Sequence, residues 1–218
     1  RDIENTLLVN IGTGGQISGY MKHFSAVGGL DVRPFPGGGY LLVGALLCGG
    51  KAYSLLENFF RSAAEFFSLP EGKVDFYARM NAINYMDLTE KLGVDTRFAG
   101  TRRDPAIRGT IAGISMNNFT PEHLIAGFLD GITKELYDFY LKMPAAVRRN
   151  VRSVAGSGNG LRRNQLLCRI ISRRFDCKLN IPRHCEEASV GAALTAAVGG
   201  GYFKNFASAG RMIRYESI

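Results

Sequence analysis

The chain has 218 residues, of which 46% are hydrophobic and 21% are charged, a composition typical of an ordinary soluble globular protein with one sizeable core or two small ones. The longest apolar stretch, Tyr40 to Cys48, is about half the length of a membrane span and contains glycine, and no apolar signal segment opens the chain. The formal net charge of +8 comes from dispersed basic residues grouped at most in pairs, so we favour a solvated surface, or one that binds phosphates of small ligands, over a nucleic-acid interface.

The four cysteines, Cys48, Cys168, Cys177 and Cys185, stand at irregular spacings without a C-x-x-C pair. In a chain of this length they predict free, partly buried thiols in a reducing compartment such as the cytoplasm. None of the three histidines stands at ligand spacing to a cysteine, so we expect no metal cluster. The sequence begins at Arg1 rather than methionine, which predicts a processed protein or a piece of a longer one.

The predicted elements begin with two strands around a glycine loop. Apolar and β-prone residues fill Leu7–Ile11 and Gln16–Lys22, an extended segment follows at Val32–Pro36, and "YLLVGALL" predicts a buried strand. From about Cys48, apolar residues recur at helical spacing through "GGKAYSLLENFFRSAAEFF", which predicts a helix. A further helix is predicted over "KVDFYARMNAINYM".

The second half of the chain alternates predicted strands and helices. Short strands "DTRFAG" and "GTIAGIS" bracket the polar loop "TRRDPAIR", and the Thr-Pro-Glu capping signal of "TPEHLIAGFLDGITKELYDFYLKM" opens a long helix. We then predict the strand "VRSVAG", the loop "SGNG", the helix "LRRNQLLCRIISRRF", the strand "KLNI" and the alanine-rich helix "EEASVGAALTAAV". Antiparallel strands followed by this alternation predict an α/β protein with a mixed β-sheet flanked by helices.

Three glycine clusters compete for the role of a phosphate site. "ALLCGGKA" imitates a Walker A loop, but Ala52 stands where that loop needs serine or threonine for Mg²⁺, so we interpret its glycines as permitting close strand-to-helix packing. "GSGNG" lacks the Rossmann spacing, although its small residues would let a planar base approach the backbone, where Asn159 or Asn164 could hydrogen-bond a base or ribose. "IGTGG" could point N–H groups at an anion, with Thr13 adding a hydroxyl, but a plain strand turn is about equally well supported.

Taken together, the loops resemble those of one protein family. "VAGSGNGLRRNQLLCRIISRRFDCKLNIPRHCEEASVGAAL" resembles the adenine-binding segment of the FGGY family of carbohydrate kinases, and "VNIGTGGQIS" resembles the phosphate-binding hairpin of that family. "DPAIRGTIAGISMNNFTPEHLIAGFLDGI" resembles its connecting stretch. The resemblance spans nearly the whole chain and is nearest to sedoheptulokinase-like members, in which G-S-G, L-x-R-N and V-G-A-A-L recur.

This resemblance implies an actin-like ATPase (ribonuclease H-like) fold, with residues 1–218 forming the C-terminal, nucleotide-binding domain of a sugar kinase that uses ATP and Mg²⁺. By matched position, a first group of residues would hold the β- and γ-phosphates, namely Gly12, Thr13 and Gly14, with Gly100 approaching from a neighbouring loop. A second group would line the adenosine pocket, namely Gly156, Ser157, Gly158 and Asn159, with Asn164 nearby. Arg102 and Arg162 are candidate helpers, weighed against plain surface arginines, and no residue is assigned as a metal ligand.

The catalytic base of the family has no counterpart in this sequence. In the family it is an aspartate in a G-D-x-Q motif upstream of the hairpin, and this motif does not occur here. We interpret Asp2 as a surface residue at a strand edge and Asp104 as a loop or capping residue. We therefore expect the base upstream of Arg1, an inactive chain when it is isolated, and two partners: the N-terminal domain of the same kinase and a sugar such as sedoheptulose or another ketose or polyol. Neither nucleic acid nor a membrane is expected as a partner. The alternative is a non-catalytic nucleotide-binding or interaction module on the same scaffold.

Overall fold

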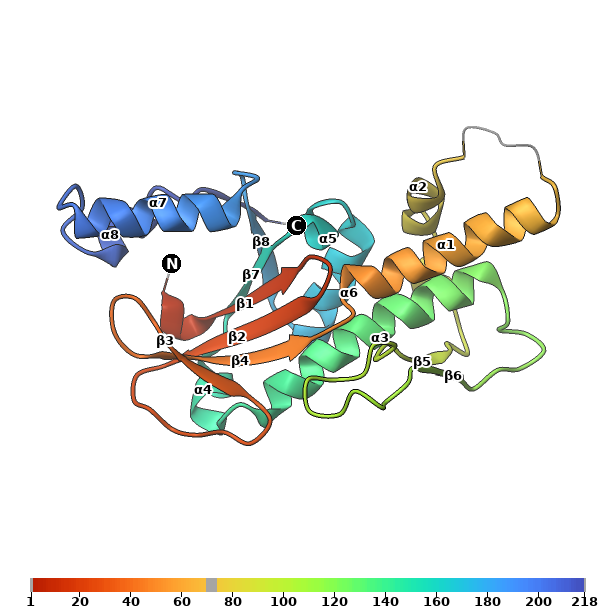
Figure 1. Cartoon of the computed structure of the whole chain (residues 1–218), viewed down its shortest axis with the longest axis horizontal. Helices are drawn as coiled ribbons and strands as arrows, with labels where there is room; N and C mark the ends of the chain where they lie inside the picture. Colours follow the sequence, from red (N-terminus) through yellow and green to blue (C-terminus); the bar gives the residue numbers. More distant parts are fainter. Residues whose placement is uncertain (1, 70–73, 218) are drawn as a thin grey trace.

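A seven-stranded mixed sheet forms the centre of the computed structural model, which describes residues 2–69 and 74–217. Its strands, in the order β3-β4-β2-β1-β7-β8-β9, fan across the middle of the molecule (Figure 1). β1 is antiparallel to β2 on one side and parallel to β7 on the other, so the pairing changes direction at β1. This confirms the predicted mixed sheet. The strand bounds are β1 (Thr6–Ile11), β2 (Gly15–Met21), β3 (Asp31–Pro34), β4 (Tyr40–Leu46), β7 (Ser153–Ser157), β8 (Lys178–Pro182) and β9 (Tyr215–Ser217).

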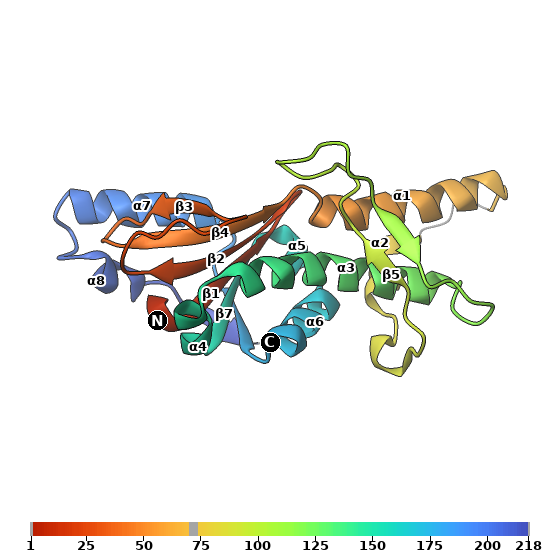
Figure 2. The same cartoon turned by 90° about the horizontal axis from the view of Figure 1, so that it is seen from below.

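The long helix α3 (Pro121–Lys142) organises the packing around this sheet. The Thr120 side chain caps its first turn as the Thr-Pro-Glu signal predicts, and the helix lies across the strands, in contact with β2 and β4 (Figure 2). Its other neighbours include α1 and α6. The remaining helices are α1 (Gly50–Phe66), α2 (Phe76–Asn81), α4 (Ala145–Asn150), α5 (Asn159–Arg162), α6 (Gln165–Phe175), α7 (Glu187–Gly199) and α8 (Phe206–Gly210), and a two-stranded sheet pairs β5 (Gly93–Asp95) with β6 (Thr110–Ala112).

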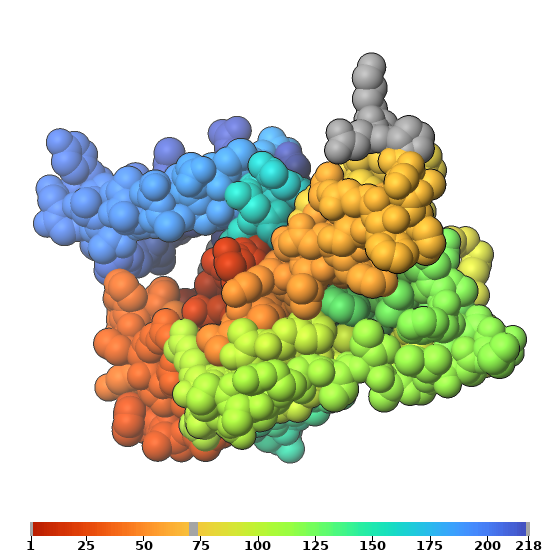
Figure 3. Space-filling view, turned by 45° about the vertical axis from the view of Figure 1, so that its right-hand side comes forward, coloured from red at the N-terminus to blue at the C-terminus, as the bar shows by residue number. Residues whose placement is uncertain are grey.

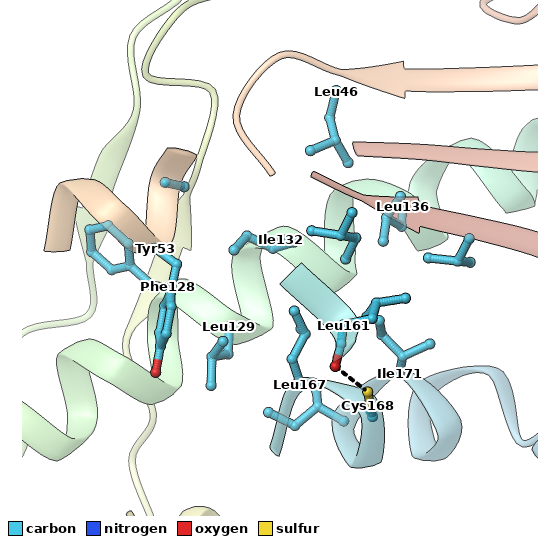
Figure 4. Close-up of a cluster of buried hydrophobic side chains, with 14 of the residues drawn as sticks. Leu46, Tyr53, Phe128, Leu129, Ile132, Leu136, Leu161, Leu167, Cys168 and Ile171 are labelled. Atoms are coloured by element: carbon cyan, nitrogen blue, oxygen red, sulfur yellow. Dashed lines mark hydrogen bonds between the residues drawn. The ribbon is translucent and has the colours of Figure 1, made fainter. Parts of the chain in front are cut away.

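Part of the apolar core lies where α1, α3, α5 and α6 meet (Figure 4). Ile132 and Leu136 of α3 are fully buried there with Leu161 of α5 and Ile171 of α6. The Cys168 thiol donates a 3.2 Å hydrogen bond to the Leu161 carbonyl, and burial raises the pKa of this thiol to about 12. This thiol therefore stays protonated and contributes to packing.

The prediction of free thiols is confirmed for all four cysteines: Cys48 and Cys168 are buried, Cys177 is half-buried and Cys185 is exposed. Within the described ranges, no cluster of three or more histidine, cysteine, aspartate or glutamate side chains has an arrangement that could hold a metal ion. The helices of the same ranges are all too short or too polar to cross a bilayer.

The structure contradicts the predicted strand over "DTRFAG", because only Asp95 of that segment belongs to a strand, β5. The Asp95 carboxylate accepts hydrogen bonds from the backbone N–H and the guanidinium of Arg97, and a left-handed turn follows at Gly100, with φ of +72°. These local bonds compete with strand pairing, which the alternation of side chains alone did not reveal.

Two predicted helices are shorter than the sequence pattern indicated. Over "KVDFYARMNAINYM", whose first residue lies outside the described residues, the helix is confined to α2, with the Asp75 side chain capping it, and a separate 3₁₀ turn forms at Tyr85–Asp87. The helix predicted over "LRRNQLLCRIISRRF" is divided into α5 and α6, because the Asn164 side chain accepts a 2.8 Å hydrogen bond from the Leu167 N–H and begins a new helix.

Candidate functional site

The glycine hairpin between β1 and β2 is built against the first turn of α1. The N–H of Gly50 donates to the Gly12 carbonyl at 2.8 Å, and the N–H groups of Gly49 and Lys51 donate to the Thr13 carbonyl at 3.1 and 2.9 Å. Thr13 lies exposed at the tip, and within the described residues its hydroxyl and N–H make no hydrogen bond. The helix therefore occupies the Gly12 and Thr13 carbonyl groups, and the Gly12 N–H donates to the Gly14 carbonyl at 3.1 Å within the turn, so the donors of Thr13 are the ones left available for an anion.

The glycine pair of "ALLCGGKA" makes this contact possible. A Cβ atom on Gly49 would lie 2.2 Å from the Gly14 carbonyl oxygen, and one on Gly50 would lie 2.5 Å from the Gly12 carbonyl oxygen. Neither neighbour can move aside, because both are backbone atoms of a tight turn. The interpretation of these glycines as packing residues is confirmed, and the structure adds that they pack the helix against the hairpin.

The second glycine loop, "GSGNG", reaches the same place from β7. Because β7 runs parallel to β1, with Asn10 opposite Ser157, the two strands end at the same edge of the sheet. Gly158 adopts a φ of +89°, and a Cβ atom there would lie 2.5 Å from the Ile11 carbonyl oxygen, which only glycine accommodates without strain. The carboxyl ends of parallel strands are where α/β sheets commonly bind ligands.

A cavity of about 890 Å³ opens between the two loops and the helices α1 and α2. Among its lining residues are four that the sequence singled out: Gly12, Thr13, Asn159 and Asn164. The other five do not line it: Gly14, Gly156, Ser157, Gly158 and Gly100. The first four of these pack directly behind the cavity, in or beside the two loops.

Gly100 is separate from this cavity. Its backbone is buried in the loop after β5, where a Cβ atom would lie 2.7 Å from the backbone of Pro105. Its role at the phosphates stays a prediction.

The outer wall of the cavity comes from residues that sequence reasoning missed. The Tyr53 hydroxyl on α1 donates to the side-chain carbonyl of Asn81 at 2.9 Å, and the Asn81 amide donates to the Arg163 carbonyl at 3.2 Å. This chain of bonds joins α1 and α2 to the α5–α6 junction. Tyr77 adds a second ring, 6.0 Å from that of Tyr53 between centroids. Burial is the main reason that the pKa of Tyr53 is raised, so its hydroxyl remains a donor.

Asn164 combines a structural bond with an unused donor. Its side chain is only 4% exposed, and its Oδ1 atom caps α6. Its Nδ2 atom is buried beside the Tyr53 hydroxyl and makes no hydrogen bond of good geometry with any described residue. A buried donor left unpaired costs about 1–3 kcal/mol, a cost that a ligand with an acceptor atom would remove.

The two candidate helper arginines are both engaged away from this cavity. Arg102 forms an exposed ion pair with Asp31 at 3.1 Å. The Arg162 guanidinium donates to the carbonyl groups of Pro182 and His184 and pairs with Glu187, so it links α5 to the end of β8 and the start of α7. Arg162 is therefore structural, whereas Arg102 is an exposed surface arginine.

The two candidate aspartates cap local turns. The Asp2 carboxylate accepts from the Glu4 N–H ahead of β1, so this residue caps a 3₁₀ turn rather than standing at a strand edge. The Asp104 carboxylate accepts from the Ala106 N–H, which confirms the capping interpretation.

A second cavity, of about 700 Å³, lies between α3, the outer strands and the loop that follows β5. Glu135 of α3 lines it near the Asp95–Arg97 ion pair, and burial raises the pKa of the Glu135 carboxyl from 4.5 to about 7. Figure 3 shows this loop spread over the front of the molecule, with the arm of α7 and α8 projecting at the far side.

Glu135 is expected to make stability depend on pH. Because its pKa is raised by folding, the folded state holds the proton more tightly, so stability falls as pH rises from about 4.5 to about 7 and then levels off. Glu135→Gln is expected to flatten this decline in urea unfolding curves recorded across that range. Glu65→Gln, which removes an exposed carboxylate from α1, is the matched control. An unchanged decline in Glu135→Gln would show that another group causes it.

Comparison with known families and curated proteins identifies relatives of this chain. A family model described as "FGGY family of carbohydrate kinases, C-terminal domain" matches residues 31–200. A xylulose kinase of Staphylococcus epidermidis is 30% identical over 105 residues, which are 48% of this chain and 21% of that protein. A glycerol kinase of Borreliella afzelii is 25% identical over 170 residues, which are 76% of this chain and 32% of that protein. The matches thus cover a third or less of these relatives.

Solved structures resemble nearly the whole chain. The xylulose kinase from Rhodospirillum rubrum matches with a TM-score of 0.79 and 20% identity, over 99% of this chain and 42% of that one. The ligand-bound xylulose kinase from Lactobacillus acidophilus matches with a TM-score of 0.75 and 15% identity, over 98% and 42%. The fold of the chain is therefore the actin-like ATPase fold of these kinases, as the resemblance in sequence implied.

Proposed function

The chain belongs to the FGGY family of carbohydrate kinases as a C-terminal domain, and from this premise we propose that it is the ATP-binding half of a kinase that phosphorylates a sugar hydroxyl. The observation that supports this most strongly is the cavity of about 890 Å³, which is lined both by Thr13, with its unused donors, and by Asn164, whose Nδ2 donor is unpaired. A nucleotide needs both: N–H and hydroxyl donors for its phosphates and polar groups beside small or aromatic walls for its base and ribose.

In this proposal the β- and γ-phosphates lie at the hairpin, against Gly12, Thr13 and Gly14. The adenosine lies between the Asn159–Asn164 segment and the Tyr53 and Tyr77 rings. Gly158 lets the second loop pack against the end of β1, and Gly156 and Ser157 are the last residues of the strand that leads into this loop. Gly100 would approach the phosphates from the loop after β5.

Mg²⁺ would accompany the nucleotide phosphates. Of the residues that the structure describes, Asp75 is the carboxylate that the cavity offers, and it already caps α2 by accepting from the Ala78 N–H at 2.9 Å. The donor set fits an ion that keeps several waters and is held chiefly by phosphate oxygens, which is how Mg²⁺ is usually bound in kinases. The ion would neutralise charge on the phosphates, while the residues of this chain position them.

The sugar and the base that accepts its proton are proposed to belong to an N-terminal domain of the same kinase. Two observations support a partner domain: the chain covers 42% of the xylulose kinase structures, and the alanine-rich helix α7 has no buried residue. We therefore propose residues 1–218 as one C-terminal domain that is inactive by itself, in a reducing compartment such as the cytoplasm. A ketose or polyol acceptor, sedoheptulose among them, is proposed from the motifs shared with sedoheptulokinase-like members.

One observation favours the second candidate, a non-catalytic nucleotide-binding module. Within residues 2–69 and 74–217, Asp75 is the carboxylate that lines the cavity, and its Oδ1 atom already serves as the cap of α2. The sequence directly before Arg1 separates the two candidates, since a G-D-x-Q motif there indicates the kinase and its absence indicates the module.

Asn164 provides the test of the nucleotide site. Asn164→Ser keeps an oxygen that can cap α6 but removes the buried Nδ2 donor. We therefore expect little change in stability but ADP binding about tenfold weaker, which corresponds to the loss of one hydrogen bond worth about 1.4 kcal/mol. Calorimetric titration of ADP into the chain, together with urea unfolding, measures both quantities.

Asn205→Ser is the matched control, since Asn205 caps α8 in the same way but lies outside the cavity. Equal ADP affinity in the wild type and Asn164→Ser would show that the Asn164 side chain does not contact the nucleotide. Absence of ADP binding in the wild type would remove the proposed function itself.

A further inference from the structure

Lys51 follows the glycine pair of the Walker-like segment "ALLCGGKA", and close packing of α1 on the hairpin does not require a lysine side chain there. It is the second residue of α1, and its N–H is bonded to the Thr13 carbonyl at 2.9 Å, so its backbone lies directly beside the tip of the hairpin. Its side chain is exposed and lines the same cavity as Gly12 and Thr13. Within the described residues its ammonium group forms no ion pair or hydrogen bond.

We propose that Lys51 is a phosphate-binding residue, whose ammonium group contacts the terminal phosphates of the bound nucleotide and positions the γ-phosphoryl group for transfer. This inference rests on the proposed function. The segment does not form a P-loop, because Ala52 lacks the hydroxyl and the phosphates lie on a β-hairpin instead. A lysine acts on phosphate as a compact point charge, so it needs proximity rather than a particular loop geometry.

The distribution of charge in the cavity singles out Lys51 among the residues that line it. Among the described residues, two cations line the cavity, Lys51 and Arg163, against the single carboxylate of Asp75. Arg163 lies next to Asn164 at the α5–α6 junction, whereas Lys51 is bonded to the hairpin. Lys51 is thus the cation at the end where the phosphates bind. The positive end of the dipole of α1, a helix of 17 residues, adds to its effect.

The unpaired Nδ2 atom of Asn164 indicates independently that this cavity receives a ligand. The atom is buried in a residue that is only 4% exposed, and Asn164 lines the cavity together with Lys51. A ligand that satisfied Asn164 and reached the hairpin would present its anionic part to Lys51. A nucleoside diphosphate or triphosphate has this shape, with a polar base at one end and negative charge at the other.

The test compares ADP with adenosine, which lacks the phosphates. We expect Lys51→Gln to weaken ADP binding to the chain about tenfold and to leave adenosine binding within twofold, as measured by calorimetry. Lys51→Arg keeps the charge and is expected to retain most of the ADP affinity. Lys22→Gln, which removes an exposed lysine in the loop after β2, is the control and should bind both ligands as the wild type does.

The outcomes separate this inference from the function on which it rests. Unchanged ADP affinity in Lys51→Gln would overturn the inference and leave the nucleotide site standing. An equal loss of ADP and adenosine binding would also overturn it, because a phosphate contact cannot weaken adenosine. A wild-type chain that binds neither ligand would remove both the proposed function and the role of Lys51.

Discussion

Gly49→Val is expected to weaken ADP binding on the order of 100-fold and to lower the free energy of unfolding by about 1–3 kcal/mol. The physical reason is the contact between α1 and the hairpin. Gly49 precedes α1 with φ of −81° and ψ of −103°, and a Cβ atom there would lie 2.2 Å from the oxygen and 2.5 Å from the carbon of the Gly14 carbonyl. The helix must therefore move away from the hairpin, and Lys51 must move with it.

The magnitude follows from the geometry that the phosphates require. In the proposed site, the donors of Thr13 and the ammonium of Lys51 contact one phosphate group, and the hydrogen bonds of 2.8 to 3.1 Å between α1 and the hairpin keep these two residues together. A displacement of about 1 Å is enough to cost on the order of 100-fold where several groups act on one ligand. Calorimetry with ADP and urea unfolding measure the two effects separately.

Gly28→Val is the matched control for this substitution. A Cβ atom on Gly28 meets no atom within 4 Å, so we expect wild-type ADP binding and little change in stability. Wild-type ADP affinity in Gly49→Val would mean that the contact between α1 and the hairpin does not shape the phosphate site.

Leu136→Ala is expected to lower the free energy of unfolding by about 2–5 kcal/mol, the cost of deleting a fully buried leucine side chain and leaving a cavity. Leu136 is 0% exposed and lies on α3, which contacts β2 and β4 as well as α6 (Figure 4). The substitution therefore weakens the joint between the sheet and the helices that carry the site. The midpoint and slope of urea unfolding measure the change.

Leu141→Ala on the same helix provides the comparison, because Leu141 is 48% exposed and its loss is expected to cost no more than about 0.5 kcal/mol. Equal effects of the two substitutions would contradict the assignment of α3 as the central support of the fold.

The parts of the fold that could be predicted from the sequence are those that nearby residues determine. The β1–β2 hairpin follows from a glycine loop between two apolar runs, and α3 follows from a Thr-Pro-Glu cap and a long apolar face. The division at Asn164 was missed, because leucines and isoleucines at helical spacing continue across it. Only the bond from the Leu167 N–H to the asparagine side chain shows that one helix ends and another begins.

The candidate site likewise contains features that the sequence indicated and features that only the fold brings together. The two glycine loops were found through their resemblance to the family, and parallel pairing of β1 with β7 brings them together. Tyr53, Asn81 and Lys51 have no signal of their own, since each enters the cavity through contacts between α1, α2 and the two loops. The isolated lysine of "ALLCGGKA" was visible, but without a P-loop around it the sequence offered no reason to place it near a phosphate.

The glycine pair before α1 therefore has two consequences in this account. It lets the helix meet the hairpin, as close packing requires, and it places Lys51 beside Thr13 at one end of the cavity. At the other end the Nδ2 donor of Asn164 remains without a partner among the described residues. Phosphoryl transfer depends chiefly on positioning and on neutralising charge, and the residues of this half are suited to both.

The central claim is that this chain binds a nucleotide between its two glycine loops, and calorimetric titration of ADP into the chain tests it most directly. We expect saturable binding at one site per chain, weakened by Thr13→Ala at the hairpin and abolished by Gly158→Val at the second loop. Absence of ADP binding, or binding that neither substitution changes, would contradict the claim.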